Sequence, residues 1–209
     1  MGYTALAVDL RVGGIYDGTA NKTVELAQKL QITAIRKSVY QDMFAAVIYA
    51  KTQLQAERVL IWGSSYTASL SFLLAGQSSV EASKTGGHVI NGVIAFSPGE
   101  DFNYFPHIQE IATTVQVPVF ITSSRGAQKD WQPIFEALPT NQKAAFVPDR
   151  SSGNNGSLLL TSSMKEKYWA AVTSFLSADF NFRNRGTLPE GSDPEKVFGD
   201  AMDNSRTLE

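Results

Sequence analysis

The sequence contains no cysteine among its 209 residues, so disulfide bonds and thiolate metal sites are excluded. Only two histidines are present, His88 and His107, and their separation in the chain argues against a zinc site. No stretch approaches the roughly 20 apolar residues of a membrane span, and no basic segment followed by a long apolar run marks a signal peptide. We therefore expect a cytoplasmic protein with no membrane partner and no bound metal.

A large excess of positive or negative charge is also lacking, because the formal net charge is only -2. A protein so nearly neutral has no general attraction for nucleic acid, which we therefore exclude as a partner. The glycine pairs at 13–14 and 86–87 lack the strand–GxGxxG–helix context of a dinucleotide site, and no GxxxxGK[ST] loop is present. We expect no cofactor. A hydrophobic content of 43% over this length suits one domain with a sizeable core.

Apolar runs and helical patterns alternate along the chain. The expected strands are short and apolar on both faces, which is typical of strands buried on both sides, and the helices between them supply the crossovers of a parallel sheet. The sequence thus predicts an α/β fold with a doubly wound, mainly parallel sheet. The expected strands are 3–10, 58–62, 92–98, 117–124 and 143–148, and the expected helices are 39–54, 69–76 (ended by Gly76), 105–115, 130–138 and 164–176.

A polar C-terminal tail over 181–209 follows a domain that we place at 1–180. In open α/β sheets, ligands bind beyond the carboxyl ends of the strands. The residues that directly follow each expected strand are therefore the candidates for a site.

One such stretch, "GSSYT" at 63–67, has the form Gly-X-Ser-X-small between an expected strand and an expected helix. This arrangement is typical of a nucleophile elbow, in which small neighbours permit a sharp turn that exposes the serine. Gly63 fills the first small position, Thr67 stands where a second glycine is usual, and Ser65 is the candidate nucleophile. The alternative is a strand-to-helix turn without chemistry.

The chain resembles the α/β-hydrolases, and among them the dienelactone-hydrolase-like branch. The resemblance covers about residues 2–177 and is carried by "GYTALAVDLR", "ERVLIWGSSYTASL", "VIAFSPGE", "VPVFITSS" and "GNNGSLLL". It implies a serine hydrolase of carboxylic esters or related acyl substrates, with a triad in the order Ser, acid, His. It also implies Ser65 as nucleophile and the backbone N–H of Tyr66 as an oxyanion donor.

The sequence departs from this family pattern at the base. Asn155, in "GNNGS", stands where the resemblance implies the catalytic histidine, and a neutral amide cannot take the serine proton. Asp130 is the first carboxylate after the strand that the family's acid follows, and N-capping of the next helix is its competing role. We interpret His88 as a surface loop residue near the amino end of the sheet. His107, on the carboxyl side, is a weaker stand-in for the base.

The beginning of the chain is a second departure, because the family segment with the other oxyanion donor has no counterpart before Met1. We expect a sheet that lacks the N-terminal strands, in a truncated chain or in one completed by direct pairing of the flanking strands or by neighbouring molecules. Because neighbouring molecules could complete the sheet, a homo-oligomer is one of the possible assemblies. The leading hypothesis is a hydrolase impaired at Asn155, and the alternatives are a non-catalytic binding or interaction protein with the same fold and a hydrolase fragment.

Overall fold

Two separate units make up the chain in the computed structural model, Met1–Glu57 and Arg58–Glu209. The structure describes residues 3–15, 18–35, 38–102, 107–149 and 153–179. The expected tail at 181–209 lies outside the described residues, and the expected single domain over 1–180 stays a prediction.

The described part of the first unit holds two α-helices, α1 (Lys22–Lys29) and α2 (Val39–Thr52). The Asn21 side chain caps α1 by accepting hydrogen bonds from two backbone N–H groups of its first turn. The expected strand at 3–10 is wrong, because this segment forms no strand in the structure. An apolar run becomes a strand only where a neighbouring strand can bond its backbone groups, and no described residue supplies one here.

The second unit is built on a four-stranded parallel sheet in the order β1-β2-β3-β4. All neighbouring strands are parallel, as the apolar runs predicted. β1 lies at one edge and pairs, among the described residues, only with β2. The strands are β1 (Leu60–Ser64), β2 (Gly92–Phe96), β3 (Val119–Thr122) and β4 (Lys143–Phe146).

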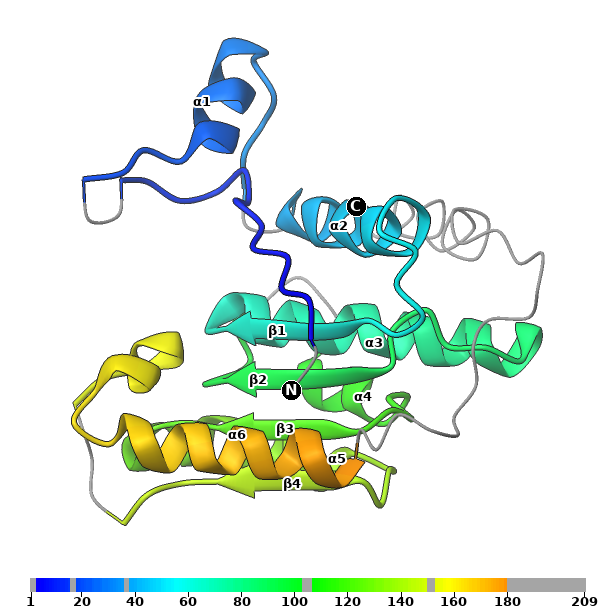
Figure 1. Cartoon of the computed structure of the whole chain (residues 1–209), viewed down its shortest axis with the longest axis vertical. Coiled ribbons are helices and arrows are strands. Elements are labelled where there is room, and N and C mark those ends of the chain that lie inside the picture. The colour runs from blue at the N-terminus through cyan, green and yellow to red at the C-terminus, as the bar shows by residue number, and fades with distance from the viewer. Residues whose placement is uncertain (1–2, 16–17, 36–37, 103–106, 150–152, 180–209) are drawn as a thin grey trace. The chain divides into compact units, whose positions relative to one another are not determined.

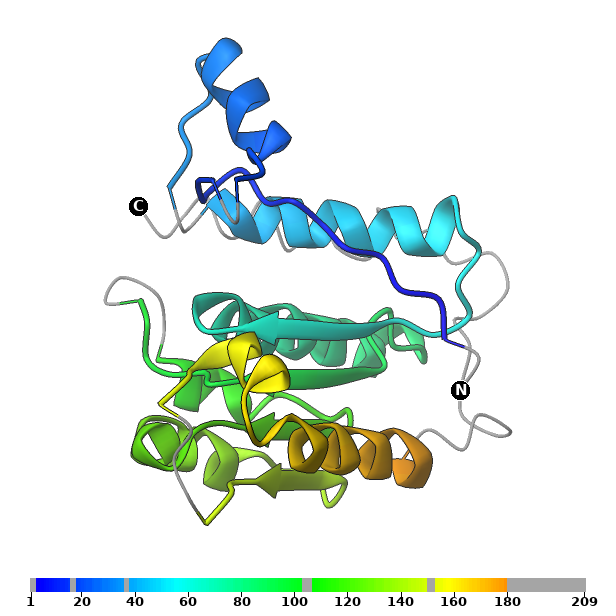
Figure 2. The same ribbon diagram turned by 60° about the vertical axis from the view of Figure 1, so that its left-hand side comes forward.

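Helices cover both faces of this sheet, which makes it doubly wound (Figures 1 and 2). One face is covered by α6, and the helices that connect successive strands lie on the opposite face. No helix in the described part of the chain is long and apolar enough to cross a membrane. The helices of this unit are α3 (Tyr66–Thr85), α4 (Ile108–Ala112), α5 (Gln128–Ala137) and α6 (Lys165–Asp179), with short 3-10 helices at Arg125–Ala127 and Gly156–Thr161.

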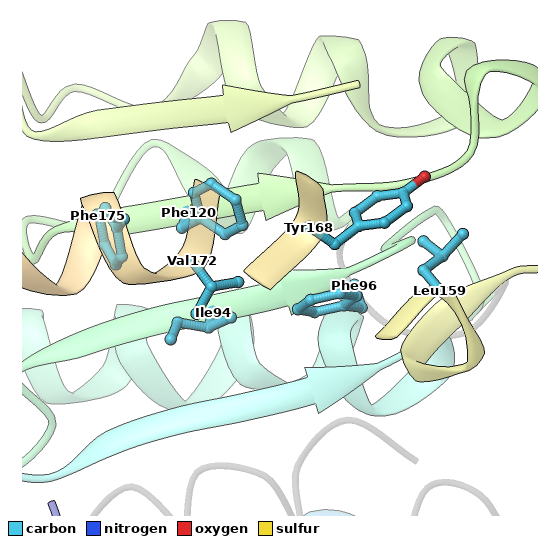
Figure 3. Packing of buried hydrophobic residues seen from close by; sticks show 7 residues of the cluster. All are labelled: Ile94, Phe96, Phe120, Leu159, Tyr168, Val172 and Phe175. Atoms are coloured by element: carbon cyan, nitrogen blue, oxygen red, sulfur yellow. The ribbon is translucent and has the colours of Figure 1, made fainter. Parts of the chain in front are cut away.

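The core between α6 and the sheet fixes the central strands in place. Figure 3 shows α6 side chains packed on residues of β2 and β3, with Leu159 from the second 3-10 helix at one end. Tyr168 is fully buried, and its hydroxyl donates a hydrogen bond to the Ser123 carbonyl. The residue that follows β3 is thereby held by the same core that stabilises the strands. The buried cluster comprises Ile94, Phe96, Phe120, Leu159, Tyr168, Val172 and Phe175.

The helix after β1 is longer than the sequence predicted. α3 does not end at Gly76 but continues to Thr85, and Gly86 closes it in a left-handed conformation. Gly76 is explained by packing instead, because a Cβ at this position would lie 2.6 Å from Thr114 Oγ1. The glycine permits a close approach between α3 and the segment after α4.

Candidate functional site

The turn between β1 and α3 holds Ser65 in a backbone conformation that L-residues rarely adopt. Its φ is 55° and its ψ is -129°. The Ser65 N–H donates to the Phe96 carbonyl of β2 at 2.8 Å, so the neighbouring strand holds the turn in place. A strained serine at the carboxyl end of a parallel strand, directly before a helix, has the geometry of a nucleophile elbow.

Gly63 is required by the sharpness of this turn. A Cβ at Gly63 would lie 2.5 Å from both the Ala68 Cα and the Thr67 carbonyl oxygen, which are backbone atoms that cannot move aside. Thr67 stabilises the turn, because its Oγ1 accepts from the Ser64 N–H at 2.8 Å. The small residues that the sequence pattern singled out are therefore explained by a near contact of strand and helix.

Ser65 faces an open pocket of about 490 Å³ at the carboxyl ends of the strands. The pocket also holds Asn155 and Asp130, so the structure brings the three predicted catalytic side chains to one cavity. Tyr66, the predicted oxyanion donor, is the first residue of α3. The described lining is Ser65, Ser97, Pro98, Gly99, Glu100, Asp101, Ala127, Asp130 and Asn155.

Asp130 does not cap the helix, contrary to the competing role that the sequence suggested. α5 begins at Gln128 with Ala127 at the N-cap position, and Asp130 lies inside the first turn with an exposed side chain. A carboxylate there interacts favourably with the positive end of the helix dipole. This position leaves the Asp130 carboxylate at the pocket.

Asn155 lines the pocket and directly precedes a 3-10 helix, whose first two backbone N–H groups are bonded to two serines. The Gly156 N–H donates to Ser97 Oγ at 3.1 Å, and the Ser157 N–H donates to Ser64 Oγ at 2.9 Å. The sequence did not reveal this role of Ser64 and Ser97. Their position at the ends of β1 and β2 was the one available signal.

Two further carboxylates that line the pocket, those of Glu100 and Asp101, accept hydrogen bonds from helices beside it. Glu100 accepts hydrogen bonds from the N–H groups of Ile108 and Gln109, at 2.6 and 2.8 Å, and so caps α4. Asp101 Oδ2 accepts from the hydroxyl of Ser69, 2.5 Å away on α3. These bonds fix Glu100 and Asp101 in the described residues that follow β2. Nowhere in the described ranges do three His, Asp or Glu side chains gather as a metal site requires.

Neither histidine is among the described residues that line the pocket of Ser65. His107 is exposed, with its Nδ1 3.6 Å from Glu100 Oε2. His88 corrects the surface interpretation, because it is half-buried and its Nδ1 has no hydrogen-bond partner among the described residues. Burial lowers the pKa of His88, since the charged imidazole would lose its hydration.

Solved structures with similar architecture identify the fold. An esterase from Pyrococcus furiosus matches with a TM-score of 0.54 at 15% identity, over 69% of this chain and 63% of the esterase. A putative dienelactone hydrolase from Klebsiella pneumoniae matches with a TM-score of 0.52 at 14% identity, over 76% of this chain and 67% of that one. A structure from work on two metagenome-derived lipolytic enzymes, LipS and LipT, matches with a TM-score of 0.52 at 13% identity. This match covers 69% of this chain and 74% of that one.

The chain thus spans about 63% of the length of the Pyrococcus furiosus esterase. No protein-family model matches the sequence, and no curated protein does. The likeness at these identities establishes the fold: the chain has the α/β-hydrolase fold, as the sequence resemblance predicted.

Proposed function

Taking the α/β-hydrolase fold as given, we propose that this protein acts on carboxylic esters or related acyl compounds, with Ser65 as the nucleophile. The observation that carries the proposal is the strained backbone of Ser65, with φ at 55°, on a turn that faces a pocket. Strain of this kind is retained where the surrounding structure enforces it, and it clusters at functional sites. The esterases and the putative dienelactone hydrolase of similar fold support the substrate class.

The proposed reaction begins with attack of Ser65 Oγ on the acyl carbonyl carbon. The hydroxyl proton of Ser65 passes to solvent water in this step, and the carbonyl electron pair shifts to oxygen. The Tyr66 N–H donates a hydrogen bond to this oxyanion. Collapse of the intermediate breaks the bond to the leaving oxygen, which takes up a proton, and water then hydrolyses the acyl-serine. Asp130 is the proposed acid of the triad.

Asn155 limits this reaction, because its side chain cannot take the proton from Ser65 Oγ. Loss of a triad member typically lowers activity by several orders of magnitude and leaves a remainder due to binding and the oxyanion hole. We therefore expect slow hydrolysis by the protein as it stands.

The variant Asn155→His tests the missing base. It should raise hydrolysis of p-nitrophenyl acetate by about 10²-fold or more, the usual contribution of general-base catalysis. The double variant Asn155→His with Ser65→Ala is the matched control and should lose the gain. If the folded Asn155→His protein hydrolyses the ester no faster than the original, the missing-base explanation is wrong.

A second candidate is a non-catalytic protein that binds acyl compounds or a partner through the same pocket. Asn155 favours it, because no described residue that lines the pocket is a histidine that could act as the base. Covalent labelling separates the two candidates, because a binding protein without a reactive serine forms no adduct at Ser65. Small-molecule esters or acyl compounds are the proposed partners in both cases.

A further inference from the structure

Two serine hydroxyls beside the proposed nucleophile hold the backbone that follows residue 155. Ser64 is the residue directly before Ser65, and its Oγ accepts from the Ser157 N–H at 2.9 Å. Ser97 directly follows β2, and its Oγ accepts from the Gly156 N–H at 3.1 Å. Two successive amides are thus bonded to the ends of two neighbouring strands, across sequence separations of 93 and 59 residues.

The space at this junction is fitted to glycine. Gly156 has a φ of +57°, and a Cβ there would lie 2.5 Å from Ser64 Oγ. Any larger residue would therefore displace the Ser64 hydroxyl or the turn itself. Glycine at this position allows the turn backbone to lie against the Ser64 hydroxyl, and it adopts the positive φ without strain.

Ser97 is itself strained, with φ at 54°. Its N–H donates to the Thr122 carbonyl at 2.7 Å, which anchors it to the end of β3. A serine in the left-handed region persists only where the surroundings enforce it. The consequence of this conformation is a hydroxyl that points at the amide of Gly156 rather than along β2.

We propose that Ser64 and Ser97 are positioning residues, which hold residue 155 at a fixed place beside Ser65. Ser97 also lines the pocket, and the positioning role of both serines acts through the turn. Catalytic side chains must lie within about 0.5 Å of the productive geometry, and loops achieve this only when a supporting shell fixes them. The positioning is a property of the fold, whereas its use in acyl transfer rests on the proposed function.

Amide hydrogen exchange measured by NMR tests the positioning itself. Ser64→Ala should accelerate exchange of the Ser157 N–H about tenfold and leave Gly156 nearly unchanged, because each hydroxyl holds one amide. Ser97→Ala should do the reverse. Ser71→Ala is the matched control, since the Ser71 hydroxyl bonds within α3, to the Thr67 carbonyl, and to neither Gly156 nor Ser157 among the described contacts. It should leave both amides protected.

A second measurement tests whether the bonds of Ser64 to this turn fix the side chain at position 155. In the Asn155→His protein, the introduced imidazole should give one sharp set of ring proton signals. Adding Ser64→Ala should move these signals toward those of a solvated histidine and lower kcat about tenfold with KM unchanged. Ser64→Thr, which keeps the hydroxyl, should restore both.

The outcomes separate this inference from the proposed function. Equal acceleration of all amides, including those of α6, or no acceleration in either alanine variant, would overturn the positioning role. Selective acceleration without any change in the ring signals would also contradict it. If Ser65 takes no covalent label and Asn155→His stays inactive, the proposed function fails, while the exchange rates and ring signals still decide whether residue 155 is positioned.

Discussion

At the scale of single residues, the Ser65 turn depends on the absence of one side chain. Gly63→Ala would place a Cβ 2.5 Å from backbone atoms of α3, so the strand and helix would have to separate. We expect a loss of about 3 kcal/mol in the free energy of unfolding, measured by urea denaturation, because overpacking against backbone is not relieved by a rotamer change.

Gly126→Ala is the matched control for this prediction. A Cβ at Gly126 would meet no atom within 4 Å, and the residue has no positive φ. Its stability should change by less than about 0.5 kcal/mol. A Gly63→Ala protein as stable as Gly126→Ala would show that the turn is not tightly packed.

The half-buried His88 predicts a pH dependence of stability. Burial lowers its pKa in the folded protein, so between that lowered value and the pKa of about 6.5 of an unfolded histidine the unfolded chain binds more protons. The contribution of His88 is therefore fully present above about pH 6.5 and is lost as the pH falls toward the folded value. Unfolding curves between about pH 7.5 and 5.5 should show this decline in the original protein.

His88→Gln should remove this component of the decline, while His107→Gln, which changes the exposed histidine, should retain it. A slope of stability against pH that is identical in His88→Gln and the original protein would contradict the assignment to His88.

The individual residues of the site also show how far the sequence alone predicts it. Ser65, Gly63 and Thr67 could be predicted, because the elbow pattern is local and its small positions follow from sterics. The support from Ser64 and Ser97 could not, since these contacts join residues 93 and 59 positions apart. Asp130 lines the pocket, and its role as the acid stays a prediction, whereas the competing capping role was wrong because the helix begins two residues earlier, at Gln128.

At the scale of elements, close packing of α3 on the segment after α4 explains Gly76, which the sequence suggested as a helix end. Alanine normally stabilises a helix interior by about 1 kcal/mol relative to glycine. Gly76→Ala should lose that gain, because its Cβ would lie 2.6 Å from Thr114 Oγ1. In a Thr114→Ala background, the same change should stabilise the protein by about 1 kcal/mol.

Thermal or urea unfolding of the two single variants and the double variant measures this coupling. A coupling free energy near zero would show that Gly76 is not required by the approach of the segment after α4. The Thr114→Ala variant alone supplies the reference for the lost Thr114 hydroxyl, which bonds to the Ile111 carbonyl.

Periodicity predicted most elements of the second unit but not their limits. The strands from β1 to β4 were found from short apolar runs, and α6 from its amphipathic pattern. The segment 3–10 has the same composition as those strands and forms none, because composition does not show whether a partner is present. The helix α1 was missed, since it is short and polar.

At the scale of the whole molecule, the sheet, its core and the serine pocket all belong to the unit Arg58–Glu209. The alternation of strands and helices was sufficient to predict its doubly wound architecture. The edge position of β1 leaves one side of that strand without a partner among the described residues. The predictions of a homo-oligomer and of a cytoplasmic location stay predictions.

The central claim is that Ser65 is a reactive nucleophile, and covalent labelling by a fluorophosphonate tests it most directly. The reagent forms a bond between Ser65 Oγ and phosphorus with loss of fluoride, so the adduct is detected in the intact mass and located by peptide mapping. We predict a single adduct on Ser65 that is absent in a folded Ser65→Ala protein. A folded protein that forms no adduct, or an adduct that persists in Ser65→Ala, would contradict the account.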